Sequence, residues 1–190
     1  MRRDADDVQR YDEVRDTIRT GDVLLYRGTL WISRLIEKVT RSEYSHSGLT
    51  AWWDGRLMVL EASRRGVVAT PLSQNVRRYH GDVVWFTCTQ DIAAEDRARL
   101  LAFAQHELGK EYSLWGAVVL GLRLLFERRI ERRDALRRER RLICSQYVAQ
   151  AYNAIGRDLK PHHSDRFMSP RDVAGSPLLR RRGVLKVGRR

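Results

Sequence analysis

The chain has 190 residues, of which 43% are hydrophobic, and it carries a formal net charge of +12. This length and hydrophobicity favour one folded domain with its own core and exclude a chain that is disordered by composition. No apolar run reaches the roughly 18 residues that a membrane-spanning helix needs, and the polar N-terminal segment has no apolar signal core. We therefore expect no Sec-type export and a cytoplasmic protein, which its charge could hold at an anionic membrane surface.

The first part of the chain predicts a charged helix followed by a short strand. Polar and acidic residues dominate the segment 1–19, which we expect to form an N-terminal helix ahead of the fold. Gly21 and Asp22 interrupt that pattern, and the apolar residues 23–26 then predict a buried strand. We expect Asp22 to have a structural role, making hydrogen bonds in the turn. Residues 29–40 place their apolar side chains on one helical face, which predicts a helix.

A β-hairpin is the clearest local prediction. The pair Asp54-Gly55 lies between two apolar runs, and this dipeptide favours a two-residue hairpin turn. That turn places Glu61 opposite Gly48 in the partner strand. Since side chains alternate along a strand, Glu61 then shares a face with His46, one diagonal step away and within reach of a long side chain.

The second half of the chain becomes predominantly helical. After further strands the apolar spacing predicts three helices, and a Ser-Pro pair resembles an N-cap followed by proline at the first helical position. Strands thus gather in the first half and helices in the second, which predicts the α+β class. The predicted segments are strands at 66–70 and 82–87, helices at 92–108, 113–140 and 144–155, and an N-cap at Ser169-Pro170.

Two basic segments carry much of the positive charge. Residues 127–141 contain eight arginines and four acidic residues, and residues 180–190 contain six basic residues and no acid. We interpret the first as a solvated face of a helical insert and residues 179–190 as a basic tail. No helix-turn-helix, RNA-recognition or zinc-finger pattern is present, so no specific nucleic-acid partner is predicted. The apolar residues 114–126 favour a core helix, or alternatively an acyl-chain lip or membrane-surface helix beside anionic headgroups.

The number of cysteines limits which disulfides and metal sites the protein can form. Only Cys88 and Cys144 are present, and without a secretory context we expect free thiols in a reducing compartment. Two cysteines are too few for a zinc site built on thiolates. The adjacent His162 and His163 do not share a helical or strand face, so they do not favour a metal site either. We expect neither a metal ion nor an organic cofactor, and we expect Cys88 to be inert core.

Cys144 is the candidate nucleophile. It opens the amphipathic pattern 144–155, and a cysteine at a helix N-terminus has its thiolate stabilised by unpaired backbone N–H groups and the helix dipole. The same N–H groups could form an oxyanion hole. His46 is the candidate base and Glu61 the candidate group that orients its imidazole. Taken alone, each of these residues is more often structural.

Two further residues are weaker candidates. Tyr44 precedes His46 closely and could donate to an oxyanion or line the cleft, although a packing role is favoured. Ser145 adjoins the thiol and is the other candidate for the substrate or oxyanion site, but as a nucleophile it is inferior to a thiol at neutral pH.

Several segments together resemble the permuted NlpC-type papain-like cysteine peptidase and amidase superfamily, in particular its YiiX-like branch. They are GDVLLYRG, WISRLIEKVT, YSHSGL, VLEA, ICSQYVAQAY and SPRDVAGSPLL, in this order. In this branch the histidine strand precedes the cysteine helix. The resemblance implies a circularly permuted papain-like α+β fold over residues 20–178, in which a small antiparallel sheet packs on the nucleophile's helix. It also implies Cys144 as nucleophile, His46 as base and Glu61 as third polar residue.

The predicted activity is a thiol hydrolase that cleaves an amide bond through an acyl-enzyme. The bond would belong to a peptide, an isopeptide or a cell-wall peptide. An alternative is a lipid acyl hydrolase or acyltransferase at an anionic membrane, because permuted relatives similar to the lecithin retinol acyltransferase group act on lipids. A third alternative is a non-catalytic binding module. The sequence leaves the peptide-like or acyl-lipid substrate and the oligomeric state open.

Overall fold

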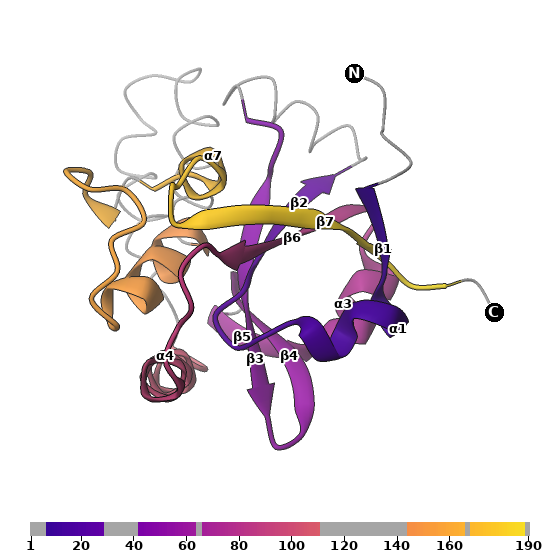
Figure 1. Cartoon of the computed structure of the whole chain (residues 1–190), viewed down its shortest axis with the longest axis horizontal. Coiled ribbons are helices and arrows are strands. Elements are labelled where there is room, and N and C mark those ends of the chain that lie inside the picture. The colour runs from indigo at the N-terminus through magenta and orange to yellow at the C-terminus, as the bar shows by residue number, and fades with distance from the viewer. Residues whose placement is uncertain (1–6, 29–41, 64–65, 111–143, 166–167, 189–190) are drawn as a thin grey trace, which may run out of the picture.

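The fold is built on one curved sheet. The computed structural model describes residues 7–28, 42–63, 66–110, 144–165 and 168–188. Within them, seven strands pair in the order β1-β7-β6-β2-β3-β4-β5, and every neighbouring pair is antiparallel except β1 with β7 (Figure 1). The strands are β1 (Val8–Arg10), β2 (Val23–Gly28), β3 (His46–Trp53), β4 (Arg56–Ser63), β5 (Gly66–Pro71), β6 (Gly81–Cys88) and β7 (Leu179–Lys186).

Helices cover both faces of this sheet, which confirms the α+β class. On one side lie α4 (Ala94–His106), α7 (Pro170–Ala174) and the helix over residues 144–153, hereafter the Cys144 helix (Figure 1). On the other side lie α1 (Tyr11–Val14) and α3 (Leu72–Arg78).

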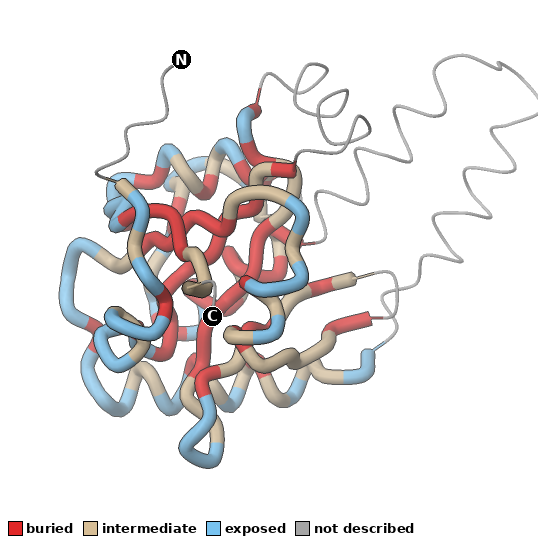
Figure 2. Tube along the Cα trace, turned by 90° about the vertical axis from the view of Figure 1, so that its right-hand side faces the viewer, coloured by how far each residue is buried: buried red, intermediate tan, exposed pale blue. Residues whose placement is uncertain are grey.

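Alternation along β2 divides the apolar core into two clusters. Val23 and Leu25 face the cluster that contains the Cys144 helix, whereas Leu24 and Tyr26 face the cluster that contains α1 and α3. All four side chains are buried, and Figure 2 shows buried segments running through the middle of the molecule. β2 therefore joins the two cores, as the strand at the centre of the sheet order must when both faces are covered.

The β3–β4 hairpin has the predicted register. Trp53 is paired with Arg56 and Leu49 with Leu60, so the turn contains Asp54 and Gly55 alone. Both turn residues have positive φ values, 46° and 69°, as a type I′ hairpin turn requires. The register confirms that His46 and Glu61 lie on the same face.

The prediction of one N-terminal helix over residues 1–19 is wrong for the described part. Residues 8–10 form β1, α1 is a single turn, and residues 15–17 form a 3₁₀ turn. Tyr11 and Ile18 are buried, so this segment belongs to the core of the fold. The local charge pattern favoured a helix, but pairing with a strand from the far end of the chain decides the conformation of β1.

The prediction of a basic tail at residues 179–190 is also wrong for most of its length. Residues 179–186 form β7, which lies between β1 and β6 in the sheet. Three consecutive arginines, 180–182, are exposed, while Leu179, Val184 and Leu185 are buried. The sequence did not predict this strand, because three consecutive arginines interrupt the alternation of apolar and polar residues and few of its positions are apolar.

Other predicted elements are confirmed with small shifts at their ends. α4 corresponds to the helix predicted at 92–108, and the Cys144 helix to the one predicted at 144–155. Ser169 caps α7 in a capping box with Asp172, directly before Pro170. α3 was not predicted. The helices predicted at 29–40 and 113–140, including the insert 127–141 and the apolar run 114–126, lie outside the described residues.

Within the part of the chain that the structure describes, no helix is long and apolar enough to cross a membrane.

Gly183 is expected to be essential for docking β1 onto β7. Its φ is 150°, and a Cβ there would lie 2.6 Å from the Asp7 carbonyl oxygen and 2.7 Å from Gln9 Cγ. We expect Gly183→Ala to lower the free energy of unfolding by about 1–3 kcal/mol in chemical denaturation. Gly175→Ala is the control, because its φ is −85° and its added Cβ meets no atom closer than 3.4 Å. Equal stability of the two variants would contradict the parallel docking of β1.

Candidate active site

The Cys144 helix holds its cysteine inside the protein. Cys144 is the first described residue of that helix and is fully buried. The helix is fastened by two tyrosine hydroxyls: Tyr152 donates to the Gly21 carbonyl over 2.7 Å, and Tyr147 donates to the Ala104 carbonyl over 3.4 Å. The residues before Cys144 lie outside the described residues, so its predicted place at the helix N-terminus stays a prediction.

His46 and Glu61 meet as the hairpin register predicts. His46 is the first residue of β3, and its Nε2 lies 2.9 Å from Glu61 Oε2. The two side chains are 28% and 16% exposed, so the contact is partly shielded from water. With Nε2 held by the carboxylate, Nδ1 is the ring nitrogen that remains for another partner.

That partner is Cys144, whose side chain is hydrogen-bonded to the His46 imidazole. Burial by itself raises the pKa of the Cys144 thiol, but the His46 charge and hydrogen bonds from His46 and Ser47 lower the pKa to about 7. Burial lowers the pKa of His46, but the Cys144 charge, and after it Glu61, raise that pKa to about 10. A thiolate–imidazolium pair is therefore favoured between these two values.

Ser47 is a contact of the sulfur that sequence reasoning missed. Both its hydroxyl and its backbone N–H hydrogen-bond to Cys144, and both stabilise the thiolate. The side chain is fully buried, with its Oγ 3.3 Å from Ser145 Oγ. Since His46 and Ser47 are consecutive, the first two residues of β3 together supply the hydrogen bonds from described residues that are the main ones lowering the pKa of the thiol. The position of Ser47 beside His46 was the available signal.

Glu61 is itself held by side chains from two other elements. Asn75 on α3 donates from Nδ2 to Glu61 Oε1 over 3.4 Å, and the Tyr26 hydroxyl donates to Asn75 Oδ1 over 3.0 Å. The Tyr26 ring also packs against the His46 ring, with centroids 5.2 Å apart. Burial, followed by the Glu61 charge, raises the pKa of Tyr26 well above its usual value, so its hydroxyl stays protonated. Asn75 was missed because α3 was not predicted.

The weaker candidates have mainly packing contacts. Tyr44 is buried, with its ring edge-on to Phe86 and the Arg27 guanidinium 5.8 Å from the ring centroid. Ser145 is fully buried and contacts Ser47 Oγ rather than solvent. These contacts do not test whether Tyr44 or Ser145 interacts with the substrate or the oxyanion, so both roles stay predictions.

The redox state of the two cysteines and the role of Asp22 agree with the sequence predictions, whereas the burial of Cys88 does not. Both cysteines are free thiols, and Cys88 is half-buried instead of fully buried, with Arg157 Nη1 3.1 Å from its sulfur. Asp22 has the structural role expected of it. Its carboxylate accepts hydrogen bonds from the Arg19 N–H, Trp85 Nε1 and Thr87 Oγ1.

A histidine strand that precedes a cysteine helix, both packed on an antiparallel sheet, defines the class of permuted papain-like proteins. The model of the permuted papain-like amidase enzymes, YaeF/YiiX, C92 family, matches residues 17–116, more than half of the chain. The chain therefore belongs to this family of amidases. The matched segment includes His46 and Glu61, while Cys144 lies beyond it.

A solved structure has the same fold. It is the crystal structure of metalloprotein yiiX from Escherichia coli O157:H7, with a TM-score of 0.60 and 22% sequence identity, covering 86% of this chain and 95% of the other. No curated protein matches the chain. Although that relative is described as a metalloprotein, the described residues of this chain contain no group of three or more His, Cys, Asp or Glu side chains that could hold a metal ion.

The ionisation of Cys144 gives a direct test of its coupling to His46. In a Cys88→Ala background, thiolate absorbance in the ultraviolet should rise with a midpoint near the pKa of about 7. In the same background, His46→Ala should move the midpoint upward, because burial then raises the pKa without an opposing positive charge. His106→Ala is the control, since that imidazole is 74% exposed on α4. An unchanged midpoint in His46→Ala would refute the coupling.

The imidazole should report the same coupling from the other side. The Cys144 charge precedes Glu61 among the causes that raise the pKa of His46 to about 10. We therefore expect Cys144→Ala to lower the His46 pKa more than Glu61→Gln does, when the ring is followed by NMR titration. The opposite order would mean that the carboxylate, and not the sulfur, is the main partner of the ring.

Proposed function

We propose that the protein is a cysteine amidase that cleaves a peptide, isopeptide or cell-wall peptide bond through a thioester intermediate. One observation carries the proposal: Cys144, His46 and Glu61 form a continuous hydrogen-bonded chain in which the pKa of the thiol falls to about 7. A thiolate available near neutral pH is the nucleophile that such chemistry needs. Membership of a family of amidases supports an amide as the bond attacked.

Each residue has a role in the proposed reaction. The Cys144 sulfur attacks the carbonyl carbon, and a C–S bond forms as the carbonyl oxygen becomes an oxyanion. When the oxyanion collapses, the C–N bond breaks and the imidazolium of His46 gives its proton to the departing nitrogen. His46 then takes a proton from water, which attacks the thioester and releases the acid and the thiolate. Glu61 stabilises the imidazolium and keeps its ring oriented.

The difference in solvent exposure between Cys144 and His46 indicates the direction from which the substrate approaches. Cys144 is fully buried, whereas the His46 side chain is 28% exposed. The carbonyl group is proposed to reach the sulfur from the side on which the imidazole meets solvent. Proton transfer to the leaving nitrogen then takes place at that same side, close to the site of bond cleavage.

The other two functional predictions have less support. The lipid alternative relied on residues 114–126 and on the arginines that follow them, and both segments lie outside the described residues. Lowering the pKa of a thiol by a half-buried imidazole serves catalysis and not simple binding, and perturbed groups of this kind cluster at catalytic sites. The observations on the described residues therefore favour amide hydrolysis.

Activity measurements on a peptide and isopeptide library test the proposal. We expect Cys144→Ala to abolish amine release, and His46→Ala to lower kcat/KM by about 10²–10⁴-fold, the contribution typical of general acid–base catalysis. Acid-quenched wild-type enzyme should show an acyl mass adduct on the peptide containing Cys144. Turnover of amides by Cys144→Ala would contradict the proposed nucleophile, and an acyl adduct obtained only from lipid esters would favour the lipid alternative.

The orienting role of Glu61 needs a separate variant. Glu61→Gln keeps the size of the side chain but removes the charge that raises the His46 pKa, so we expect kcat to fall by about 10-fold or more and the basic limb of the pH profile to move downward. The matched control is Glu95→Gln, an exposed position on α4, which should retain wild-type kcat. Equal activity of the two variants would remove Glu61 from the mechanism.

A further inference from the structure

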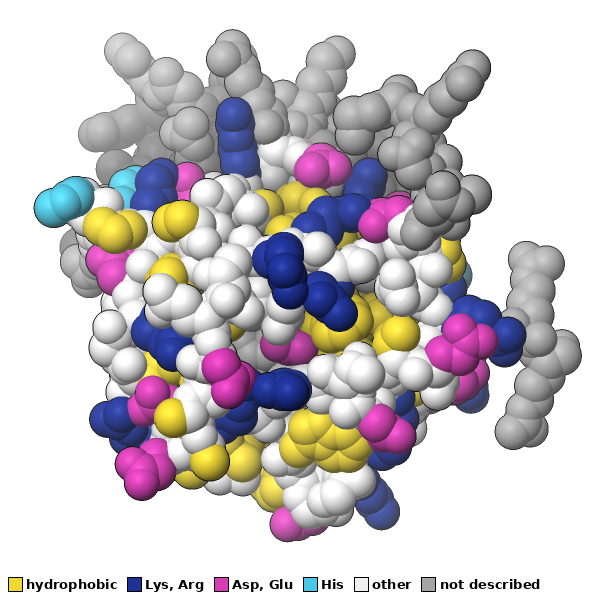
Figure 3. Space-filling view, in the orientation of Figure 1, with side chains coloured by type: hydrophobic (Ala, Val, Ile, Leu, Met, Phe, Trp, Pro, Cys, Tyr) yellow, Lys and Arg dark blue, Asp and Glu magenta, His cyan; other side chains and the backbone are white. Residues whose placement is uncertain are grey.

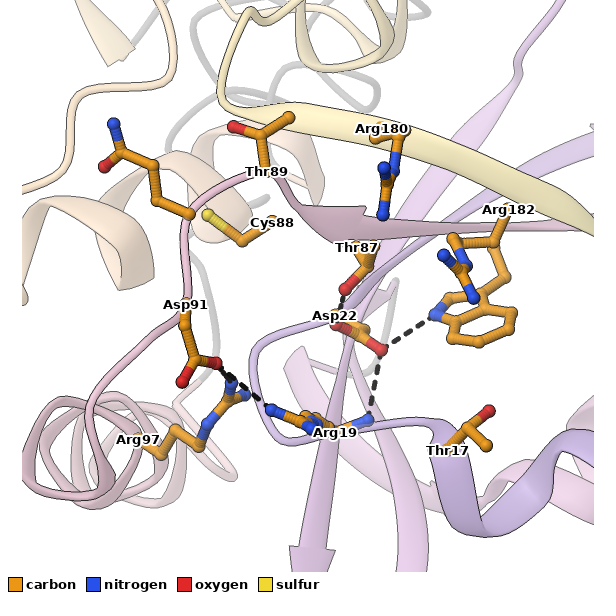
Figure 4. A pocket seen from close by; sticks show the side chains of 12 residues that line it. Thr17, Arg19, Asp22, Thr87, Cys88, Thr89, Asp91, Arg97, Arg180 and Arg182 are labelled. Atoms are coloured by element: carbon orange, nitrogen blue, oxygen red, sulfur yellow. Dashed lines mark hydrogen bonds and ion pairs between the residues drawn. The ribbon is translucent and has the colours of Figure 1, made fainter.

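A polar cavity lies at the opposite end of β2 from His46. It has a volume of about 510 Å³ and is lined by residues from the turn before β2, from β6 and the loop after it, from α4 and from β7 (Figure 4). Asp22, directly before β2, lies in this cavity, whereas Tyr26, near the other end of the strand, packs on His46. Tyr26 is four residue steps along the chain from Asp22, about 13 Å in an extended strand, so the cavity is distinct from the cysteine site.

The floor of the cavity contains a buried carboxylate, and both of its oxygens already accept hydrogen bonds. Asp22 is 2% exposed, and its oxygens accept hydrogen bonds from Trp85 Nε1 at 2.8 Å, Thr87 Oγ1 at 2.9 Å and the Arg19 N–H at 3.0 Å. These donors come from β6 and from the turn before β2. Asp22 therefore organises the floor and does not need a cation from solvent.

One wall of the cavity contains two arginines that share a single acid. Arg19 Nη1 and Arg97 Nη2 lie 3.1 and 3.0 Å from the same oxygen of Asp91. Arg97 also donates to the Thr20 carbonyl, which fixes its guanidinium against the turn. One carboxylate cannot neutralise two guanidinium groups, so this wall keeps a positive charge.

The opposite wall is formed by two arginines of β7. Arg180 is paired with Thr87 across the strands, and a bulge between Trp85 and Phe86 places the Arg182 guanidinium 5.3 Å from the Trp85 ring centroid. Both side chains are exposed, and neither guanidinium has a hydrogen bond or ion pair with a described residue. Figure 4 shows both reaching from β7 toward Thr87 and Asp22, and Figure 3 shows basic side chains gathered at the middle of this face.

We propose that this cavity binds a small organic ligand through a phosphate monoester group. The lining residues contain four guanidinium groups against two carboxylates, which leaves an excess of two positive charges. A phosphate monoester carries nearly two negative charges at neutral pH, and the planar fork of arginine matches its oxygens. The cavity volume of about 510 Å³ exceeds what one phosphate group fills, so there is room for an organic part.

Contacts from Arg157 connect the cavity wall to the Cys144 helix, so ligand binding is expected to stabilise this helix as well. Arg157, just after that helix, donates to the Cys88 sulfur over 3.1 Å and to the Asp91 carbonyl over 2.7 Å. Cys88 and Asp91 both line the cavity. A ligand that orders this wall therefore stabilises the folded protein, and the thermal unfolding temperature should rise with ligand concentration.

Calorimetric titration with glycerol 3-phosphate, at low and constant ionic strength, tests the site. We expect Arg180→Gln to weaken binding about 10-fold or more, since a charge-assisted bidentate contact is lost. Arg181→Gln is the matched control: it removes the same charge from the next residue, whose guanidinium pairs with Asp7 and does not line the cavity. Binding to this control should stay within about twofold of wild type, because general surface charge contributes little at such short range.

The outcomes separate the site from general electrostatic attraction. The proposal would be overturned if Arg180→Gln and Arg181→Gln weakened binding equally. It would also be overturned if neither glycerol 3-phosphate nor phosphatidate vesicles gave binding heat or thermal stabilisation. Binding of vesicles alone, lost in Arg180→Gln and kept in Arg181→Gln, would assign the phosphate to a lipid headgroup. Binding of glycerol 3-phosphate with the same dependence would assign it to a free ester. Circular dichroism of each variant verifies that these exposed substitutions leave the fold intact.

Discussion

Burial of the Cys144 thiol opposes its ionisation, and the positive charge of the His46 imidazole reverses that effect. The rest of the site can be understood as support for this one ion pair. The sulfur is carried by a helix that two tyrosine hydroxyls fasten to the turn before β2 and to α4. The imidazole is carried by the first residue of a strand that is paired on both sides. Neither partner can move far without losing buried contacts, so the pair is held in place before any substrate arrives.

A chain of hydrogen bonds extends this support away from the sulfur. Glu61 holds the ring nitrogen of His46, Asn75 holds Glu61, and the Tyr26 hydroxyl holds Asn75. These side chains come from four different elements: β2, β3, β4 and α3. Since both carboxylate oxygens of Glu61 have a hydrogen-bond partner, the carboxylate has little freedom to rotate away from the imidazole. The sheet order places β2, β3 and β4 side by side, which is the condition for this chain to form.

The positive charge of the protein is partly organised by the sheet. Arg180 and Arg182 are carried by β7 and lie over the polar cavity, whereas Arg181 between them pairs with Asp7. A run of three arginines is thus divided between two environments by the strand and its bulge. The cavity and the cysteine site occupy opposite ends of β2, and the Cys144 helix touches both through Arg157 and its own first residue.

Local sequence determined those parts of the protein in which neighbouring residues decide the outcome. The Asp54-Gly55 turn sets the hairpin register because both residues adopt positive φ, and this register alone predicted that His46 and Glu61 would meet. Ser169 and Asp172 determined the start of α7 in the same local way. Tertiary structure decided the rest. β1 and β7 are strands because they pair across almost the whole chain, a contact that no local pattern encodes. The pKa of Cys144 likewise depends on burial and on charges that only the folded chain brings to the sulfur.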